Sequence, residues 1–444
     1  MLFTVNISLA NCERFLVVAV LMLLGAVGAG VAAETEGGGE GSVTVKVSTL
    51  VREVLEGNPE LAFYRAEVDV ARGGGEVATS WSSPQVTTTV GQHRLTAGDV
   101  TAEGLAWSVG VQQTFEWPGR MMLRRAIADR EVELAELGLA QFRAALEARV
   151  RGLAYGLYAA QEKAAAAREV ALRFEALREV MVQRDAAGLT PLLETRIIEA
   201  TELTLKRRAS EAALEMESMV LELNQLRGGA WTRGVRVEPL GLTFGEVPAM
   251  EDLLASVRTN NFELRMRRVE LEQQGFEVSL VKKGVYAGWS VGPYFSDQRA
   301  GDHEQQVGIS LSLPLPLWGG HGARAEVAEA RRQQAATSLR VTERDVERRV
   351  VEAVMRYRVK LLEMSKWRGD AVEEFRRAAE VADRHYRLGA VPVATYVELQ
   401  KQYLEAVEAL LDTRLEALEA AQRVWHLTGV DLGAVRFEEG VERD

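Results

Sequence analysis

Five histidines are the residues best suited to bind a metal ion or transfer a proton, but their spacing supports neither role. No His-Glu-x-x-His or similar ligand pattern occurs in the sequence. Two of them are expected in strand–strand connections, where they could meet a metal ion in transit, although an exposed loop histidine is the ordinary interpretation. We therefore expect no catalytic residue, no metal centre and no cofactor. The five are His93, His303, His321, His385 and His426.

The single cysteine and the one glycine run offer no other chemistry. Cys12 precedes an apolar run, whereas a lipidated cysteine would follow it, so thiol chemistry and disulfides are not expected in the mature chain. Gly73-Gly74-Gly75 lacks the strand–turn–helix setting of a phosphate site and is expected to break a helix before the first strand. The sequence thus favours a function other than catalysis.

The first 33 residues have the pattern of an export signal. Arg14 precedes an apolar run from Phe15 to Val27, and small residues lead to Val31-Ala32-Ala33 before Glu34. The run is too short and too close to the start of the chain for us to prefer a membrane helix over a signal peptide. We expect a signal peptide over 1–33 and a flexible Gly- and Glu-rich leader over 34–47.

The composition favours long helices and argues against a nucleic-acid partner. Of the 444 residues, 47% are hydrophobic but only 7% aromatic, and 26% are charged with Glu and Arg interleaved. The formal net charge of −11 opposes binding to a polyanion.

The sequence contains an internal duplication with a period of about 200 residues, far longer than that of a solenoid. Asn58-Pro59-Glu60-Leu61 returns as Asn261-Phe262-Glu263-Leu264, and Gly188-Leu189-Thr190-Pro191 returns as Gly389-Ala390-Val391-Pro392. Each copy is expected to contain a short helix, two strands and two long helices. We place the first repeat at 48–232, the second at 233–430 and a C-terminal tail at 431–444.

Four segments alternate between apolar and small polar residues, which predicts strands. In the second, Leu105, Val109 and Val111 share one face, whereas Ser108 and Gly110 share the other. The predicted strands are about 84–92, 105–117, 285–295 and 306–317.

Such segments suit a transmembrane β-barrel, because each has one apolar and one polar face and spans about ten residues. Tryptophans near the strand ends resemble an interfacial aromatic belt. A sheet covering a soluble core gives the same alternation, so periodicity alone leaves both alternatives open, and the export signal favours the outer membrane. The candidate interface residues are Trp107, Trp117, Trp289 and Trp318.

Four strands cannot close a barrel, and an open edge in lipid leaves backbone groups unsatisfied. If the strands span a membrane, several chains must therefore share one barrel. Three chains would supply twelve strands, which lies within the known range.

Two long proline-free segments predict helices, about 119–188 and 319–388, which return as helices at about 191–227 and 392–428. Their apolar residues recur every three or four positions, as in coiled-coil seams. Glycine can end the outgoing helix and proline suits the start of the returning one. The four expected tip residues are Gly188, Pro191, Gly389 and Pro392.

These motifs, in this doubled order, resemble those of the TolC-like outer-membrane efflux proteins over roughly 45–430. The segment from Phe115 to Arg120 is most similar to the branch that serves heavy-metal and related resistance-nodulation-division pumps. The resemblance implies a mainly α fold with a small β part, assembled as a homotrimer with a twelve-stranded barrel in outer-membrane lipid and an α-helical periplasmic tunnel. It also implies a periplasmic adaptor protein and an inner-membrane pump as partners, and a chain that is not an enzyme.

The resemblance further implies that acidic residues after the second tip turn ring a periplasmic gate. The matching positions are Thr395, which departs from the acidic pattern, and Glu398, which keeps it. Glu194 and Asp185 are further candidates near the first tip. A carboxylate ring favours cations, but a solvated Glu at a helix start is equally ordinary.

Three other functions share features with this sequence. A duct for type I protein secretion has the same architecture and stays open. A periplasmic coiled-coil adaptor or scaffold needs only one hairpin, so the duplication argues against it. A diffusion porin has many more strands and little helix.

Overall fold

The computed structural model describes ten ranges of the chain, to which all statements about structure below refer. They form two compact units, of which unit 1 comprises Asp69–Leu134 and Val269–Thr337, and unit 2 comprises the rest. Each unit combines segments from both sequence repeats, so the repeats are not separate domains. The described ranges are 43–97, 100–117, 119–185, 192–229, 234–238, 240–284, 288–314, 320–367, 371–430 and 436–439.

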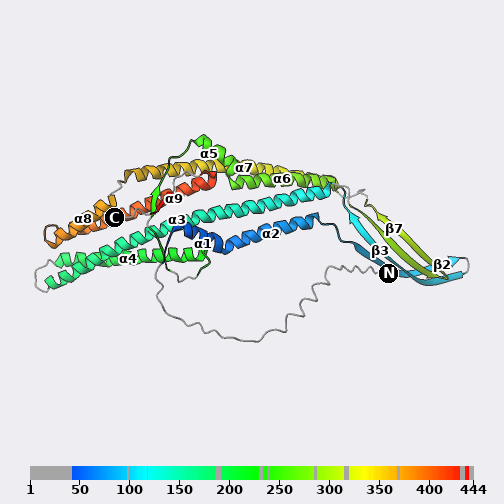
Figure 1. The fold of residues 1–444 in the computed structure, drawn as a ribbon, viewed down its shortest axis with the longest axis horizontal. Helices are drawn as coiled ribbons and strands as arrows, with labels where there is room; N and C mark the ends of the chain where they lie inside the picture. Colours follow the sequence, from blue (N-terminus) through cyan, green and yellow to red (C-terminus); the bar gives the residue numbers. More distant parts are fainter. Residues whose placement is uncertain are drawn as a thin grey trace, which may run out of the picture. The chain divides into compact units, whose positions relative to one another are not determined.

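Unit 1 contains one antiparallel sheet of four strands in the order β2-β3-β6-β7 (Figure 1). The hairpins β2–β3 and β6–β7 come from the first and second repeats and meet through β3 and β6, where Val109 pairs with Phe295. The sheet is therefore a fusion of two equivalent hairpins. The bounds are β2 Gln85–Ala97, β3 Val100–Phe115, β6 Trp289–Ala300 and β7 Asp302–Ser312.

Unit 2 is mostly helical and contains two small sheets, a parallel pair β1–β4 and an antiparallel pair β5–β8. Four helices have residues in both units: α2 Pro59–Thr79, α3 Arg120–Asp185, α6 Phe262–Lys283 and α7 His321–Lys366. The elements wholly in unit 2 are β1 Val43–Val45, α1 Val47–Gly57, α4 Leu192–Leu226, β4 Val235–Val237, β5 Leu240–Thr243, α5 Met250–Asn260, α8 Ala371–Arg387, α9 Val393–Thr428 and β8 Arg436–Glu439.

The predicted helix seams form the hydrophobic core of unit 2. On α3, Leu146, Val150 and Leu157 are buried, and Val350 and Tyr357 are buried on α7. The buried Tyr357 hydroxyl donates to the Gly245 carbonyl at 2.9 Å, which satisfies its polar end. Apolar residues spaced three or four positions apart thus form one buried stripe on each helix, as the sequence predicted.

Each repeat is held together by one buried asparagine between two short helices. Asn58 and Asn261 have nearly the same backbone angles (φ −69° and ψ 122°, φ −65° and ψ 122°). Their Oδ1 atoms accept from the amides of Leu61 and Leu264, which caps the next helix. Their Nδ2 atoms donate at 3.0 and 2.9 Å to backbone carbonyls at the ends of α4 and α9. The repeated Asn thus ties the start of each repeat to its end.

Asn261→Ala should destabilise the folded protein by ~1–3 kcal/mol, because it removes a helix cap and leaves the Leu427 carbonyl without this donor. Thermal unfolding followed by circular dichroism measures the loss. Asn261→Ser keeps a capping oxygen and removes the amide donor without adding a charge, so it should fall between wild type and Asn261→Ala. An unchanged midpoint for Asn261→Ala would show that the tie does not stabilise the fold.

The strands differ from expectation at their ends. β2 extends to Ala97, and β3 already begins at Val100. Trp107 therefore lies in the middle of β3 and not at its end. β7 stops at Ser312, before Pro314, which has no amide hydrogen to donate. The predicted strand residues 285–287 and 315–317 lie outside the described ranges, as does Trp318.

The second long helix is interrupted, contrary to the continuous helix expected over 319–388. α7 ends at Lys366 and α8 begins at Ala371. Gly369 and Asp370 lie between these bounds, outside the described residues, and both residue types are poor helix formers.

Three smaller expectations also need correction. The leader expected over 34–47 includes β1 and the first residue of α1, and the tail expected over 431–444 includes β8. The helix α2 continues through Gly73-Gly74-Gly75, although a break was predicted. A Cβ added to Gly75 would lie 3.6 Å from the Cβ of Ala128 on α3, which is an ordinary contact distance. The signal peptide expected over 1–33 lies outside the described residues.

Candidate channel wall and gate

One face of the sheet in unit 1 is apolar and uncovered within the chain. The strand register places alternate residues of neighbouring strands on the same face. Val307 and Ile309 of β7 are 82% and 76% exposed, far more than is usual for large aliphatic residues. The exposed members of this face are Val86, Val90, Leu105, Val109, Val111, Val307, Ile309 and Leu311.

Aromatic residues mark both ends of this apolar face. At one end Phe115 stacks on Trp289 at 4.9 Å, and Trp81 meets Phe115 edge-on. At the other end, Trp107 packs against Phe295. Trp107 lies eight residues before Phe115 on β3, a separation of about 27 Å along the strand, or about 21 Å along the barrel axis for a strand tilted by ~40°. That height is close to the ~25 Å band of a membrane barrel. Trp117, just after β3, is partly exposed.

Charged and amide side chains begin at the level of Trp107, on the same face. Trp107 is paired with Asp297, which is only 3% exposed. The Asp297 carboxylate accepts from Gln305 Nε2 at 3.1 Å and Arg299 Nε at 3.2 Å, and it contacts His303 Nε2 at 2.5 Å. Apart from Leu105, two residues beyond Trp107 on β3, the apolar band therefore ends where this polar cluster begins.

The opposite face of the sheet carries small polar residues and glycines. Gln112 donates to Ser310 at 3.2 Å and Thr114 meets Ser290 at 2.9 Å. The Tyr294 ring lies over Gly308, where an added Cβ would come within 2.6 Å of it. Among the residues whose side chains the structure describes, the charged residue on this face is Glu304, near the start of β7. It has the chemistry of a water-filled surface.

The sheet has two open edges within the described chain, β2 and β7. Each presents a row of backbone donors and acceptors on one side, which is the arrangement that recruits another strand. An apolar face, a polar face and two open edges together form an incomplete barrel wall.

No helix among the described residues is long and apolar enough to cross a membrane. Within the same residues, no group of three or more His, Cys, Asp or Glu side chains could hold a metal ion. His303 instead contacts Asp297, and His426 lines a cavity.

The second tip turn has the predicted glycine geometry. Gly389 follows α8 with φ +73°, and the amides of Gly389 and Ala390 donate to the Tyr386 and His385 carbonyls at 2.9 Å. Pro392 is the N-cap of α9. The first tip turn, with Gly188 and Pro191, lies outside the described residues.

The structure places the gate candidates near helix ends. Thr395 and Glu398 lie on the exposed side of α9, where Gln402 donates to Glu398 at 2.9 Å. Glu194 lies in the first turn of α4 and is partly buried. Asp185 is the last residue of α3, and the structure does not describe its side chain. Their role in a gate stays a prediction.

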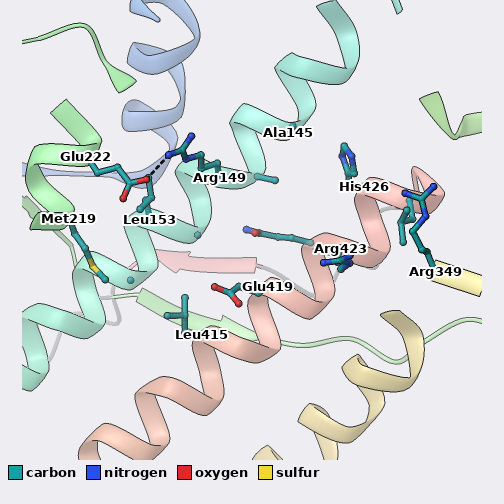
Figure 2. Close-up of a pocket in the computed structure, with 15 residues that line it drawn as sticks. Ala145, Arg149, Leu153, Met219, Glu222, Arg349, Leu415, Glu419, Arg423 and His426 are labelled. Atoms are coloured by element: carbon teal, nitrogen blue, oxygen red, sulfur yellow. Dashed lines mark hydrogen bonds and ion pairs between the residues drawn. The ribbon is translucent and has the colours of Figure 1, made fainter. Parts of the chain in front are cut away.

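A cavity of 560 Å³ between α3 and α9 was missed from the sequence. Figure 2 shows Arg149 and Leu153 of α3 on one side and Glu419 and Arg423 of α9 on the other. Two glycines one turn apart, Gly152 and Gly156, were the available signal.

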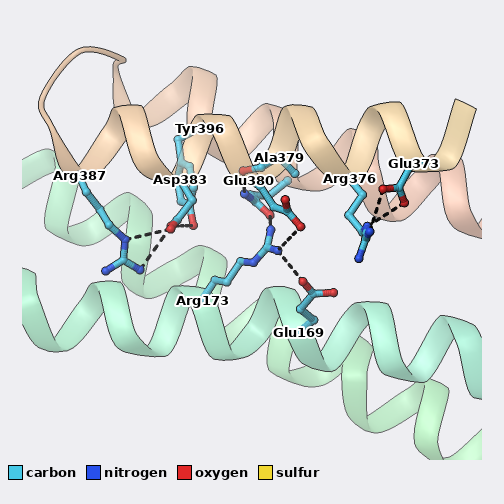
Figure 3. A network of polar contacts seen from close by, with 10 residues as sticks. Glu169, Arg173, Glu373, Arg376, Ala379, Glu380, Asp383, Arg387 and Tyr396 are labelled. Atoms are coloured by element: carbon cyan, nitrogen blue, oxygen red, sulfur yellow. Dashed lines mark hydrogen bonds and ion pairs between the residues drawn. The ribbon is translucent and has the colours of Figure 1, made fainter. Parts of the chain in front are cut away.

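A polar network near the second tip was also missed (Figure 3). Arg173 of α3 donates to Gln400 Oε1 of α9 at 3.3 Å and to Glu169 at 2.5 Å, and lies 3.9 Å from Glu380 of α8. Gln400 is fully buried and donates to the Ala379 carbonyl at 2.8 Å. Arg173 thus links the α3 helix of the first repeat to the hairpin of the second.

A tyrosine extends this network toward the turn. The Tyr396 hydroxyl donates to Asp383 at 3.2 Å, and Asp383 also accepts from Arg387 at 2.9 Å. Burial, followed by the Asp383 carboxylate, raises the pKa of Tyr396, so the phenol stays protonated as a donor. A sequence pattern could have identified the acidic and basic residues of α8 in this network, but it could not have shown that they lie against Arg173 of α3.

Arg173→Met should loosen the contact between α3 and α9, because the buried Gln400 amide oxygen loses a charged donor. An unsatisfied buried acceptor costs ~1–3 kcal/mol. The expected result is faster proteolysis of the α8–α9 turn. Arg207→Met removes an equally long but exposed arginine that pairs with Glu211 of its own helix, α4, and should leave the rate unchanged. Equal rates for both variants would contradict the role of Arg173.

Comparison with known proteins agrees with this geometry. The sequence profile of the family described as outer membrane efflux protein matches residues 253–430. The fold is similar to the CmeC outer membrane channel of Campylobacter jejuni, with a TM-score of 0.72 and 14% identity over 94% of this chain and 95% of that chain. No curated protein sequence matches the chain significantly.

Two further solved structures share the fold. CusC has a TM-score of 0.68 and 14% identity over 87% of this chain and 92% of that chain. The open state of the MtrE outer membrane channel of Neisseria gonorrhoeae has a TM-score of 0.62 and 17% identity over 89% and 94%. The family match over the second repeat and the fold shared over most of the chain agree with the resemblance seen in the motifs: residues 253–430 match the outer membrane efflux protein family, and the chain has the fold of outer-membrane efflux channels.

Proposed function

We propose that three copies of the chain close one twelve-stranded barrel, which is the exit duct of a tripartite efflux system. The observation that carries the proposal is the four-stranded sheet with one exposed apolar face, one polar face and two open edges. Closure would place the apolar face against lipid and satisfy both edges, as a membrane requires.

Exposed apolar stripes on the helices of unit 2 also support several copies. Val341, Met355 and Leu362 recur on α7 at multiples of seven residues and are all exposed. On α4, Leu214 and Leu221 are exposed seven residues apart. A seven-residue apolar repeat is the pattern of a helix that packs along another helix, and a neighbouring copy would supply that helix.

Disulfide cross-linking between the sheet edges tests the shared barrel. Ile309→Cys on β7 would be combined with cysteine at 86, 88 or 90 on β2, in a chain where Cys12, the only native cysteine, is replaced by Ser. At least one pair should give linked species of up to three chains in outer membranes. A pair on the two central strands, Val109→Cys with Phe295→Cys, should link only within one chain. Absence of intermolecular products for every edge pair would contradict the proposal.

Through this duct we infer passage of small molecules or metal ions from a periplasmic adaptor and an inner-membrane pump to the exterior. The similarity of the Phe115–Arg120 segment to the heavy-metal branch supports a pump of the resistance-nodulation-division class. Restored resistance in a strain that lacks its own outer-membrane channel, with such a pump and adaptor supplied, would test this partnership.

Glu398→Ala should make the closed channel leakier, because we propose that three Glu398 carboxylates ring the tunnel mouth near the second tip. Single-channel conductance in planar bilayers is expected to rise, and the preference for cations should fall. Glu405→Ala removes another exposed carboxylate of the same helix two turns away and serves as the control. Conductance that is the same in Glu398→Ala as in wild type would argue against the gate.

A further inference from the structure

The helix α2, which leads into the edge strand β2, carries an exposed apolar stripe. Phe63, Val70 and Val77 recur every seven residues and are 67%, 74% and 75% exposed. A different face of α2 packs within the chain, where Leu61 and Val68 are buried. A seven-residue apolar repeat is the pattern of a helix that packs along another helix. Thus α2 has a second packing face, which no described residue covers.

Small residues separate the large ones on this stripe, and one of them belongs to the run Gly73-Gly74-Gly75. Ala66 and Gly73 each lie three residues after a member of the apolar repeat, and both are exposed. A Cβ added to Gly73 would have no atom within 4 Å, so the packing of the single chain does not require glycine there. Glycine is also a poor helix former. Large and small residues in alternation allow a second helix to interdigitate closely.

The helix α7, which follows the other edge strand β7, carries a matching stripe. Its members recur at steps of four and three residues, carry no charge and are all exposed: Ala323, Val327, Ala330, Gln334 and Thr337. The chain runs toward the sheet along α2 and away from it along α7, so the two stripes would meet as antiparallel helices.

The charges that flank the two stripes are opposite in sign. The flanking positions are those just before each large residue and just after each small one. On α2 the charged residues at these positions are Glu67, Asp69 and Glu76, and on α7 they are Arg324, Arg331, Arg340 and, as the exception, Glu326. Asp69 lies 4.0 Å from Arg72, whereas the other six form no ion pair among the described residues. Charges beside an apolar seam select the partner helix, and these fit α2 to α7.

The sheet keeps the two stripes apart within one chain. β2 and β7 are its two edges, with β3 and β6 between them, and α2 and α7 are the helices next to these edges in the chain. If β2 of one copy pairs with β7 of the next, as proposed above, the helix contact continues the strand contact along the same boundary between copies.

We propose that α2 of one copy packs antiparallel against α7 of the next copy. Val70 and Val77 lie against the stripe from Ala323 to Thr337, and Gly73 is the point of closest approach. This inference rests on the shared barrel of the proposed function. It adds the pair of helices that extends the boundary beyond the sheet, and it gives the glycine run of α2 a role.

Cysteine cross-linking of the full-length protein in outer membranes tests the contact. Val77→Cys would be combined with Ala323→Cys, Val327→Cys or Ala330→Cys in the chain that carries Cys12→Ser. At least one pair should link chains into species of up to three. Val77→Cys with Gly275→Cys is the control and should give no link, because α6 leads into the central strand β6.

The outcomes separate this inference from the shared barrel. If no α2–α7 pair links in membranes where the β2–β7 pairs do, the helix contact is refuted and the barrel stands. If neither kind of pair links, both proposals fall. A link from Val77→Cys to a protein other than this chain would also overturn the inference.

The glycine is tested by filling its place. Gly73→Leu should lower the yield of heat-resistant oligomer about tenfold, because the overpacked contact would occur at all three boundaries. Gly275→Leu makes the same change on α6, where an added Cβ also has no atom within 4 Å, and should leave the yield within about twofold of wild type. Equal yields for the two variants would show that no helix approaches Gly73.

The flanking charges are tested by reversal and rescue. Glu67→Lys combined with Glu76→Lys should reduce the yield of oligomer, because lysines would then face the arginines of α7. Adding Arg324→Glu and Arg331→Glu to the same chain should restore the yield. A fourfold variant that assembles no better than the twofold one would overturn the proposed pairing of α2 with α7.

Discussion

Gly292→Ala is expected to abolish assembly of the protein in the outer membrane. A Cβ at this position would lie 1.6 Å from the Val111 carbonyl oxygen, far inside contact distance. That oxygen belongs to the backbone of β3, which is fixed by pairing with β2 on its other side. No side-chain rotation can relieve the overlap, so β3 and β6 must separate, and the two hairpins lose the contact that joins them.

The measurement is the yield of protease-resistant protein in isolated outer membranes. Gly91→Ala is the matched control, because Gly91 lies on the edge strand β2 with no atom within 4 Å of an added Cβ. It should assemble at the wild-type yield. Normal yield for Gly292→Ala would mean that β6 does not pair with β3 as described.

Ile309→Lys should strongly reduce assembly by placing a charge on the apolar face of β7. Ile309 lies between Val307 and Leu311 on this face, all three highly exposed in the single chain. A lysine facing lipid near the middle of a membrane barrel costs ~2–4 kcal/mol. In a trimer the charge occurs three times, so the effect on the assembled state is multiplied.

Ser310→Lys provides the control on the next residue, whose side chain faces the opposite way and bonds to the Gly292 carbonyl and Gln112. A lysine there would point toward water in the closed barrel, and assembly should be largely retained. Equal losses for the two variants, measured as heat-resistant oligomer on gels, would show that the faces of the sheet are assigned wrongly.

Elements with a strong local pattern could be predicted from the sequence. The alternation around Val109 and Ile309 identified strands and their faces, because a strand side chain must point to one side or the other. The spacing of Val150 and Tyr357 identified helix seams that the structure buries. The repeated Asn-x-Glu-Leu motif identified the duplication, although the bonds that Asn58 and Asn261 make to α4 and α9 are visible only in the fold.

Features set by distant contacts could not be predicted. Strand ends depend on the partner strand, so β2 and β3 support each other beyond the alternating segment, and Trp107 lies mid-strand. The bond from Arg173 to Gln400 joins residues 227 positions apart, and no sequence pattern pairs them. The cavity at Gly152 likewise appears only when α9 is laid against α3.

The central claim is that three copies of this chain form one channel in the outer membrane. The most direct measurement is the mass of the protein extracted from outer membranes in mild detergent, determined by native mass spectrometry. A complex of three chains that persists on dilution is the predicted result. A single chain that is stable in detergent-free buffer would contradict the account, because the apolar face of the sheet would then cover an ordinary core and the two open edges would need no neighbours.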